Sequence, residues 1–247
     1  MVKTKISCFI LGMLVFISPA VFSIETPIDI AGVLSFMVGD IHVSPDGKAW
    51  KEGHLNMELL VGNYVKTGKD SRCEITLSDK TIVRMDENSK QRFEKKDTQT
   101  ETKAGELFLF AGKLWLNARK IMSKDDSFKV RTNKAVCAIR GTVFSVEEKS
   151  TYTQIRVLKG EVTSWSTIFE GRNEKIKPTG EPMVSKPYPV KGPQTVTMEE
   201  WVEVVKALQQ ITIDAKGGYE KQAFNFEKIS KDPWVEWNIK RDNLLTN

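Results

Sequence analysis

Residues 107–116 read LFLFAGKLWL, a run of nearly uninterrupted apolar residues with a glycine, Gly112, near its middle. A short apolar run of this kind is typical of strands that are buried in a sheet. Outward from it, apolar and polar residues alternate in short segments at residues 72–77, 128–132, 143–146 and 155–157. Alternation with a period of two places one face of a strand in the core and the other in water. The stretch from residue 31 to 165 therefore predicts an all-β fold, either a sandwich, a roll or a solenoid.

The composition is that of a globular protein of one or two domains. The chain has 247 residues, of which 40% are apolar and 28% charged, with 37 Lys and Arg against 32 Asp and Glu. The small positive excess is spread along the chain, so we expect no nucleic-acid partner. With only His42, His54 and three cysteines, the chain cannot form a zinc site of ordinary spacing, and a histidine-dependent triad would need one of those two histidines. We expect no cofactor, no metal site and no catalytic residues.

The first 23 residues have the three parts of a secretory signal peptide. Lys3 and Lys5 precede an apolar run at residues 6–17, and small or medium-sized residues up to Ser23 form the cleavage region. An uncleaved membrane anchor is the alternative, but the run is shorter than the roughly 20 residues that span a bilayer. We therefore expect a periplasmic or secreted protein with no transmembrane segment after removal of residues 1–23.

Two cysteines, Cys73 and Cys137, would remain in the exported protein. An oxidising compartment would allow them to form a disulfide. Both lie in apolar sequence, where a buried thiol is equally natural. The sequence leaves the disulfide and the two buried thiols as alternatives.

After the β-rich stretch the composition changes twice. Residues 166–196 contain five of the nine prolines, and because proline removes a donor from a sheet, we expect a covering segment or linker there. At Thr197 the period changes to that of a helix, and Thr197 and Glu200 are placed as a capping box. One face of this expected helix, residues 197–215, carries Trp201, Val204, Val205 and Leu208. It would either cover the β-domain or dock a partner, and Pro233 would break any continuous helix further on.

These changes divide the chain into four parts. They are a signal peptide (1–23), a β-domain (24–165), a proline-rich covering segment or linker (166–196) and a C-terminal amphipathic helix with a tail (197–247).

Over residues 32–165 the chain resembles the FecR domain of bacterial envelope proteins, with several motifs in the family's order. The sharpest segment is residues 128–144, which contains AVCAIRGTVF. The motif residues, which we interpret as structural, are Gly32, Gly39, Gly62, Gly68, Ser71, Arg72, Arg140, Gly141, Thr142, Phe144 and Gly160. The resemblance implies a FecR-like two-sheet β-roll or short β-solenoid. Because the chain begins with the expected signal peptide, we expect no cytoplasmic segment of the kind with which the family's regulators hold a sigma factor.

Arg140 and two tryptophans of this domain could each have a structural or a ligand-binding role. Arg140 lies between apolar runs, where a guanidinium is tolerated only if its donors meet carbonyl groups or a carboxylate. We interpret it as a buried arginine that joins strands, with a ligand-binding arginine as the alternative. Trp50 and Trp165 are interpreted as core residues rather than as platforms for sugar rings.

Three functions from different classes follow. The leading hypothesis is a non-enzymatic binding or scaffold module whose partner is an envelope protein or a cell-wall component. The second is envelope signal sensing through a separate membrane partner, as in FecR-like regulators. The third is an enzyme that acts on polysaccharide, which is less favoured because the sequence offers no convincing pair of carboxylates for glycoside hydrolysis.

Overall fold

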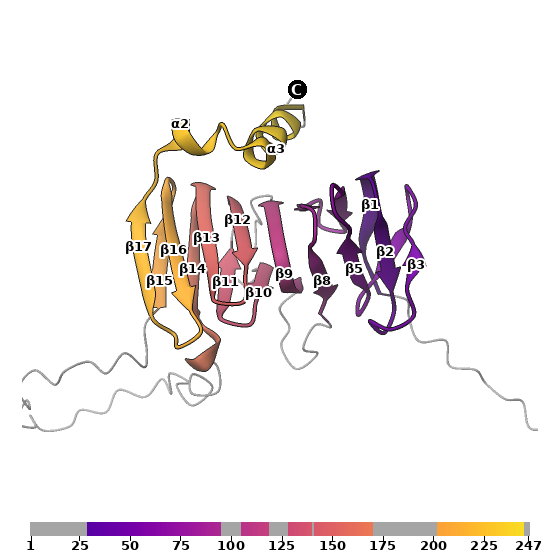
Figure 1. The fold of residues 1–247 in the computed structure, drawn as a ribbon, viewed down its shortest axis with the longest axis horizontal. Coiled ribbons are helices and arrows are strands. Elements are labelled where there is room, and N and C mark those ends of the chain that lie inside the picture. The colour runs from indigo at the N-terminus through magenta and orange to yellow at the C-terminus, as the bar shows by residue number, and fades with distance from the viewer. Residues whose placement is uncertain (1–28, 95–104, 119–127, 140, 170–201, 245–247) are drawn as a thin grey trace, which may run out of the picture.

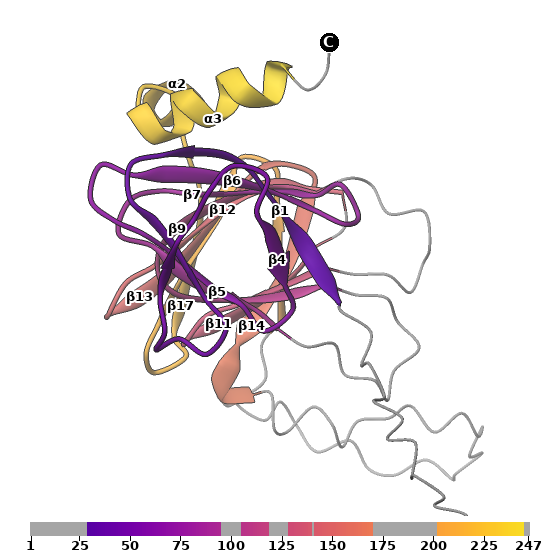
Figure 2. The same ribbon diagram turned by 90° about the vertical axis from the view of Figure 1, so that its right-hand side faces the viewer.

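The computed structural model describes residues 29–94, 105–118, 128–139, 141–169 and 202–244. These residues form two β-sheets that face one another, with two helices on the outer side of one sheet (Figure 1, Figure 2). The predicted all-β roll of two sheets is confirmed. The expected signal peptide, Arg140 and residues 170–201 of the proline-rich and following segments lie outside the described residues.

The first sheet, called sheet 1, carries the helices on its outer face. Its strands in spatial order are β4 (Glu58–Leu60), β1 (Ile30–Val38), β6 (Arg72–Leu77), β7 (Ile82–Met85), the second half of β9 (Glu106–Asn117), β12 (Val143–Glu148), β13 (Tyr152–Lys159), β16 (Gln209–Asp214) and β17 (Tyr219–Ala223). Each of these pairs is antiparallel.

The second sheet, called sheet 2, faces sheet 1. Its strands are β3 (Lys51–Glu52), β2 (Ile41–Ser44), β5 (Tyr64–Thr67), β8 (Lys90–Phe93), the first half of β9, β10 (Phe128–Arg131), β11 (Ala135–Ile139), β14 (Glu161–Ser166) and β15 (Val202–Lys206). Among the described strands of this sheet, β9 and β10 alone run parallel. A single 3-10 turn, η1 (Thr167–Phe169), follows β14.

Strand β9 belongs to both sheets, and Gly112 is the position where it passes from one to the other. Residues 106–111 pair with β8 and β10 of sheet 2, whereas residues 112–117 pair with β7 and β12 of sheet 1. Gly112 has a φ of 95°, and a Cβ built on it would lie 2.2 Å from Ser89 Oγ. The apolar run that predicted buried strands is therefore one long strand with a bend that only glycine accommodates.

The core lies between the two sheets. Leu34 and Ile75 project into it from sheet 1, and Ile41 and Val65 project into it from sheet 2, all with no exposed surface. Full burial of an aliphatic side chain of this size stabilises the fold by about 1.5–3 kcal/mol. The alternation seen in the sequence thus marks the inner face of each sheet.

The prediction of a helix at residues 197–215 is wrong for the part that the structure describes. Residues 202–206 and 209–214 form strands β15 and β16 instead. Val205 is buried in the core, Val204 is 40% exposed on the other side of its strand, and Leu208 lies in the turn with a φ of 63°. The expected docking face is therefore not formed, and Trp201 lies outside the described residues. The edges of β14 and β13 offer hydrogen-bond partners to this β-branched segment, and that tertiary pairing overrides the helical pattern.

A helix does exist nearer the C-terminus. After the single-turn helix α2 (Phe226–Ile229), α3 (Pro233–Leu244) begins at an aspartate: Asp232 Oδ1 accepts hydrogen bonds from Trp234 N at 2.9 Å and Val235 N at 3.2 Å. Asp at the N-cap and Pro in the first turn form a strong helix start. Pro233 thus begins a helix rather than breaking one. Neither described helix has the length and apolar character needed to cross a membrane.

Cys73 and Cys137 are free thiols in the core, so the disulfide alternative is not formed. Cys73 lies on β6 of sheet 1, Cys137 lies on β11 of sheet 2, and neither has exposed surface. Burial raises the pKa of Cys73 to about 12, and burial also raises the pKa of Cys137. Of the two alternatives, the structure has the buried thiols.

We expect Cys73 and Cys137 to resist Ellman's reagent in the native protein at about pH 8 and to react rapidly in guanidinium chloride, since only the thiolate attacks. The raised pKa also means that the neutral thiol is favoured by folding. The stability that Cys73 contributes is complete below its ordinary pKa of 9.0 and is lost as the pH rises from there toward 12. Rapid colour development in the native protein would contradict the buried positions.

Candidate functional site

The motif residues near the start of the domain bring two distant turns together. A Cβ on Gly39 would lie 2.4 Å from Ser71 Oγ, and that oxygen accepts a hydrogen bond from Asp40 N at 2.8 Å. Gly68 N donates to Asp40 O, also at 2.8 Å. The glycines and the serine are needed because the two turns touch without room for larger side chains.

A second group of motif residues joins two turns in the later half of the domain. A Cβ on Gly160 would lie 3.1 Å from Gly141 O, and Thr142 Oγ1 donates to Glu161 O at 2.8 Å. Phe144 is fully buried. These contacts of the described residues are internal to the fold.

Gly32 and Gly62 belong to neither group, and Arg72 directly follows Ser71 of the first group. A Cβ on Gly32 would lie 2.7 Å from Thr76 O on the neighbouring strand, whereas Gly62 has a φ of 93° and open space around it. Arg72 projects from sheet 1, where its Nε donates to Asp86 Oδ1 at 2.9 Å. Among the described residues, the motif residues are therefore distributed over several turns and strands rather than gathered in one site.

The outer face of sheet 1 holds α3 through a row of side chains that the strand register aligns. Phe36 pairs with Glu74, Glu74 with Arg84, and Arg84 with Trp115 on successive strands. Because paired residues point to the same side, the four side chains form a continuous row across the sheet. We call this row and its α3 partners the helix-docking cluster: Phe36, Glu74, Arg84, Trp115, Trp237, Asn238, Arg241 and Asp242.

Arg84 is the centre of the helix-docking cluster and has no exposed surface. Its Nε donates to Glu74 Oε2 at 2.6 Å, and its Nη1 donates to Asp242 Oδ1 at 2.7 Å. Trp115 Nε1 donates to the other oxygen of Asp242 at 2.9 Å. A guanidinium between two carboxylates is the kind of pairing that a buried charge requires.

Glu74 receives a second arginine from the helix. Arg241 Nε and Nη2 donate to Glu74 Oε2 and Oε1 at 3.0 and 3.1 Å. Burial by itself raises the pKa of Glu74, but the hydrogen bonds and charges of Arg241 and Arg84 outweigh it, so that the pKa lies below its usual value. The helix-docking cluster therefore fixes α3 to sheet 1, and its charges are used internally.

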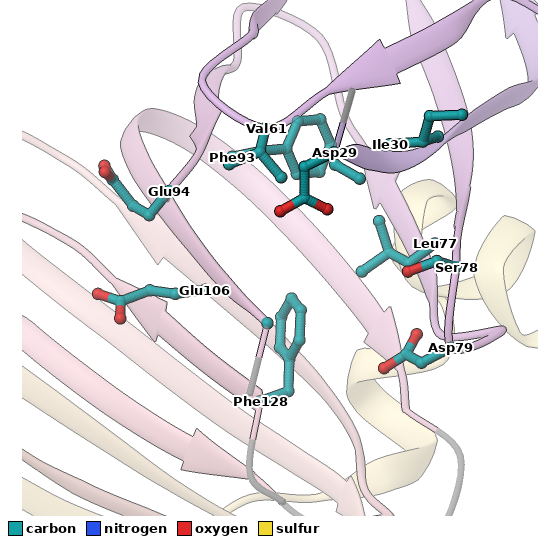
Figure 3. Close-up of a pocket in the computed structure, with 12 residues that line it drawn as sticks. Asp29, Ile30, Val61, Leu77, Ser78, Asp79, Phe93, Glu94, Glu106 and Phe128 are labelled. Carbon is teal, nitrogen blue, oxygen red and sulfur yellow. The ribbon is translucent and has the colours of Figure 1, made fainter. Parts of the chain in front are cut away.

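A pocket opens beside the starts of β1, β9 and β10 and the ends of β6 and β8 (Figure 3). It encloses about 500 Å³, part of it open to solvent, and Leu77, Phe93 and Phe128 form apolar parts of its lining. Of the carboxylates that line it, Glu94 is bonded to an arginine at 2.5 Å and Glu106 to another at 3.3 Å. The described residues contain no group of three or more His, Cys, Asp or Glu placed to bind a metal ion.

The outer face of sheet 2 has a different character. Aromatic and basic side chains project from it, since they alternate along the strands with buried residues such as Val65, Gln91 and Leu109. Neither α2 nor α3 covers this side, because both helices lie over sheet 1 (Figure 2). We call this surface the aromatic–basic face: Trp50, Tyr64, Lys66, Lys90, Arg92, Phe108 and Phe110.

The cations of the aromatic–basic face lie over its rings. Lys66 Nζ is 4.2 Å from the Trp50 ring centroid, and Lys90 Nζ lies 5.4–5.5 Å from the centroids of Trp50, Tyr64 and Phe110. Such cation–π contacts are each worth about 0.5–1 kcal/mol at exposed sites. Within the described part of the chain, Lys66 and Lys90 have no carboxylate partner. The face thus presents positive charge that no acid among the described residues neutralises.

The two tryptophans interpreted as core residues are not in the core. Trp50 and Trp165 are half-buried and lie outside the buried cluster between the sheets. Trp50 follows the short turn after β2, and Trp165 alternates on β14 with the buried Ser164 and Ser166. Both tryptophans therefore face outward, on the side of sheet 2.

A groove adjoins the aromatic–basic face at Phe110. It has a volume of about 550 Å³, and Asn133 and Ser150 supply polar atoms to its lining. At its base Lys134 Nζ donates to Glu148 Oε1 at 2.5 Å, and both of these side chains are buried. The groove extends the surface that the aromatic residues begin.

The sequence reasoning missed the helix-docking cluster and most of the aromatic–basic face. Arg84 had a detectable signal, since it is a charge inside the apolar run at residues 81–85. The members of the aromatic–basic face are spread over residues 50–110, and only strand pairing brings Tyr64, Arg92 and Phe108 into one row. No local pattern in the sequence records that row.

The described residues define a two-sheet β-roll with a helix-covered outer face on sheet 1 and an aromatic and basic outer face on sheet 2. Residues 63–163 match the family model described as FecR protein, so this part of the chain is similar to a FecR domain. This family match supports a regulatory protein of the envelope type. Comparison with curated proteins finds no match.

Two crystal structures of a provisionally assigned anti-sigma factor from Parabacteroides distasonis ATCC 8503 are similar to this chain. Each has a TM-score of 0.46 and 16% sequence identity, over 68% of this chain and 62% of that protein. The chain thus spans less than two thirds of the length of the solved relative.

Proposed function

We propose that this chain is a non-enzymatic binding module of the bacterial cell envelope that holds an envelope partner through its aromatic–basic face. The observation that carries the proposal is the state of Lys66 and Lys90, which stand over aromatic rings without a carboxylate partner among the described residues. A cation without an internal partner is available to an external one, and half-exposed rings add contact area. The expected signal peptide would deliver the chain to the periplasm or the cell exterior.

The family match supports the same surface. Residues 63–163 include every member of the aromatic–basic face except Trp50. The surface therefore belongs to the FecR domain itself, and any partner held there acts on that domain. Envelope sensing is the second candidate, favoured by the family match, with a separate membrane protein as the receiver.

Site-directed photocrosslinking tests the proposed face. We expect p-benzoylphenylalanine at Tyr64 to give a crosslinked product in intact cells, because Tyr64 lies within the face. The matched control is Phe226→p-benzoylphenylalanine, since Phe226 is an exposed aromatic on α2, on the side of sheet 1. Crosslinking at both positions or at neither would contradict the proposed function.

A further inference from the structure

We infer that the ligand of the aromatic–basic face is an acidic polysaccharide, with sugar rings on Tyr64 and Phe110 and sugar carboxylates on Lys66 and Lys90. This inference rests on the proposed function and names its ligand class. It combines two features of the face that a single ligand must satisfy, namely flat apolar rings and unpaired positive charge.

The rings form a continuous platform. Tyr64 and Phe110 are stacked at 23° with centroids 5.8 Å apart, and Phe110 and Phe108 have centroids 4.6 Å apart. Aromatic side chains are suited to ligands that have an apolar face and a polar edge. A hexose has both, because its C–H groups gather on one face of the ring and its oxygens lie at the edge.

The charge of Lys90 stands over two rings of this platform. Lys90 Nζ lies within 5.5 Å of the Tyr64 and Phe110 ring centroids, so a sugar on either ring would place a carboxylate within its reach. Arg92 is already used, because it donates to Tyr64 Oη at 2.9 Å and to Glu94 at 2.5 Å. The lysines therefore carry the free charge, and Arg92 orients the ring of Tyr64.

The lysines also favour a polysaccharide over a protein partner. Lysine is depleted at protein–protein interfaces, whereas arginine and aromatic residues are enriched there. Here the unpaired cations are lysines, and the arginine is bound internally. An acidic polymer with repeated charges fits this arrangement better than a protein surface does.

The adjoining groove fits a ligand that is longer than one sugar. It begins at Phe110, the last ring of the platform, and its volume of about 550 Å³ lies within the range of small-molecule sites. Asn133 and Ser150 offer hydrogen-bonding groups of the kind that sugar hydroxyls use. The platform and the groove together form one path for a chain of sugars.

The test measures binding of the purified chain to polygalacturonate, with neutral dextran and poly-L-glutamate as comparison polymers. We expect binding to polygalacturonate that weakens with added salt, and none to dextran. The variant Lys66→Gln/Lys90→Gln should lose about tenfold in affinity. The control Lys228→Gln/Lys231→Gln removes the same charge at exposed positions away from the face and the groove and should leave affinity unchanged.

A second variant separates stacking on rings from attraction to a basic surface. Phe110→Leu should weaken polygalacturonate binding about fivefold and leave any poly-L-glutamate binding unchanged, because a peptide chain has no sugar ring to stack. Equal melting temperatures of the variants and the parent would show that folding is intact. Binding that is lost only with the lysines, or that is equal for both acidic polymers, would overturn the inference and identify an acidic protein as the partner class.

The two proposals fail separately. A crosslinked product at Tyr64 in cells without polygalacturonate binding in solution would overturn the polysaccharide and leave the binding face standing. Absence of the crosslinked product would instead overturn the proposed function, whatever the purified chain binds.

Discussion

Gly112→Ala is expected to prevent the chain from folding. The substitution places a Cβ 2.2 Å from Ser89 Oγ and 2.5 Å from Ser89 Cα, in a backbone conformation with a φ of 95°. A non-glycine residue at such a φ costs about 1–3 kcal/mol, and forced overpacking costs about as much again. Since a domain has only about 5–15 kcal/mol of stability, this loss removes a large share of it.

The neighbouring serine cannot relieve the clash. Ser89 N donates to Thr67 Oγ1 at 2.9 Å, and Ser89 Oγ accepts a hydrogen bond from Lys113 N at 3.0 Å. The backbone of Ser89 is thus held from two sides. Even Ser89→Ala combined with Gly112→Ala should remain unfolded, because the clash with the backbone of residue 89 persists.

Gly62→Ala is the matched control for Gly112→Ala. Gly62 has nearly the same φ, 93°, but a Cβ there would meet nothing within 4 Å. Its loss should be limited to the backbone strain of about 1–3 kcal/mol. Circular dichroism melting of both variants makes the comparison, and equal melting temperatures would show that β9 does not cross Ser89 as closely as described.

Arg84→Ala is expected to destabilise the protein by about 3–5 kcal/mol and to release α3 from sheet 1. Removing one member of a buried ion pair leaves the other charge without compensation. Here Asp242 would keep the indole of Trp115, at 2.9 Å, and Glu74 would keep Arg241 and the hydroxyl of Ser35, but neither would keep Arg84. Chemical denaturation measures the loss, and limited proteolysis within residues 233–244 reports the release of the helix.

Lys240→Ala is the control on the same helix. Lys240 forms an exposed pair with Glu236, with 72% of its side chain in solvent, so its removal should leave the melting temperature unchanged. A double-mutant cycle of Arg84→Ala and Asp242→Ala should show coupling between the two sites. Independent, additive losses would mean that Arg84 does not hold the helix through Asp242.

The strands of the β-rich stretch could be predicted because the signal for a strand, the alternation of apolar and polar residues, lies within the strand itself. Alternation at residues 72–77 and 143–146 identifies the inner faces without knowledge of the partner strand. The wrong helix prediction has a similar cause. The spacing of Val204, Val205 and Leu208 along the chain also fits one face of a helix. Only the open edges of β13 and β14 decide between the two patterns, and those edges are distant in sequence.

The helix-docking cluster lay beyond prediction for a related reason. Arg84 and Asp242 are separated by 158 positions, and no periodicity connects them. The start of α3, in contrast, could have been predicted from two neighbouring residues. Asp232 followed by Pro233 is a typical helix start, so the interpretation of Pro233 as a helix breaker overlooked what precedes it.

The shared strand β9 also determines how the molecule responds to mechanical load. Its first half is hydrogen-bonded to β8 and β10, and its second half to β7 and β12. This one strand is therefore hydrogen-bonded to four others, two in each sheet. A pull on either sheet is transmitted along β9 to the other sheet, and neither sheet can be peeled away while the other stays intact. We therefore expect the two sheets to unfold together, as one mechanical unit, when the chain is stretched.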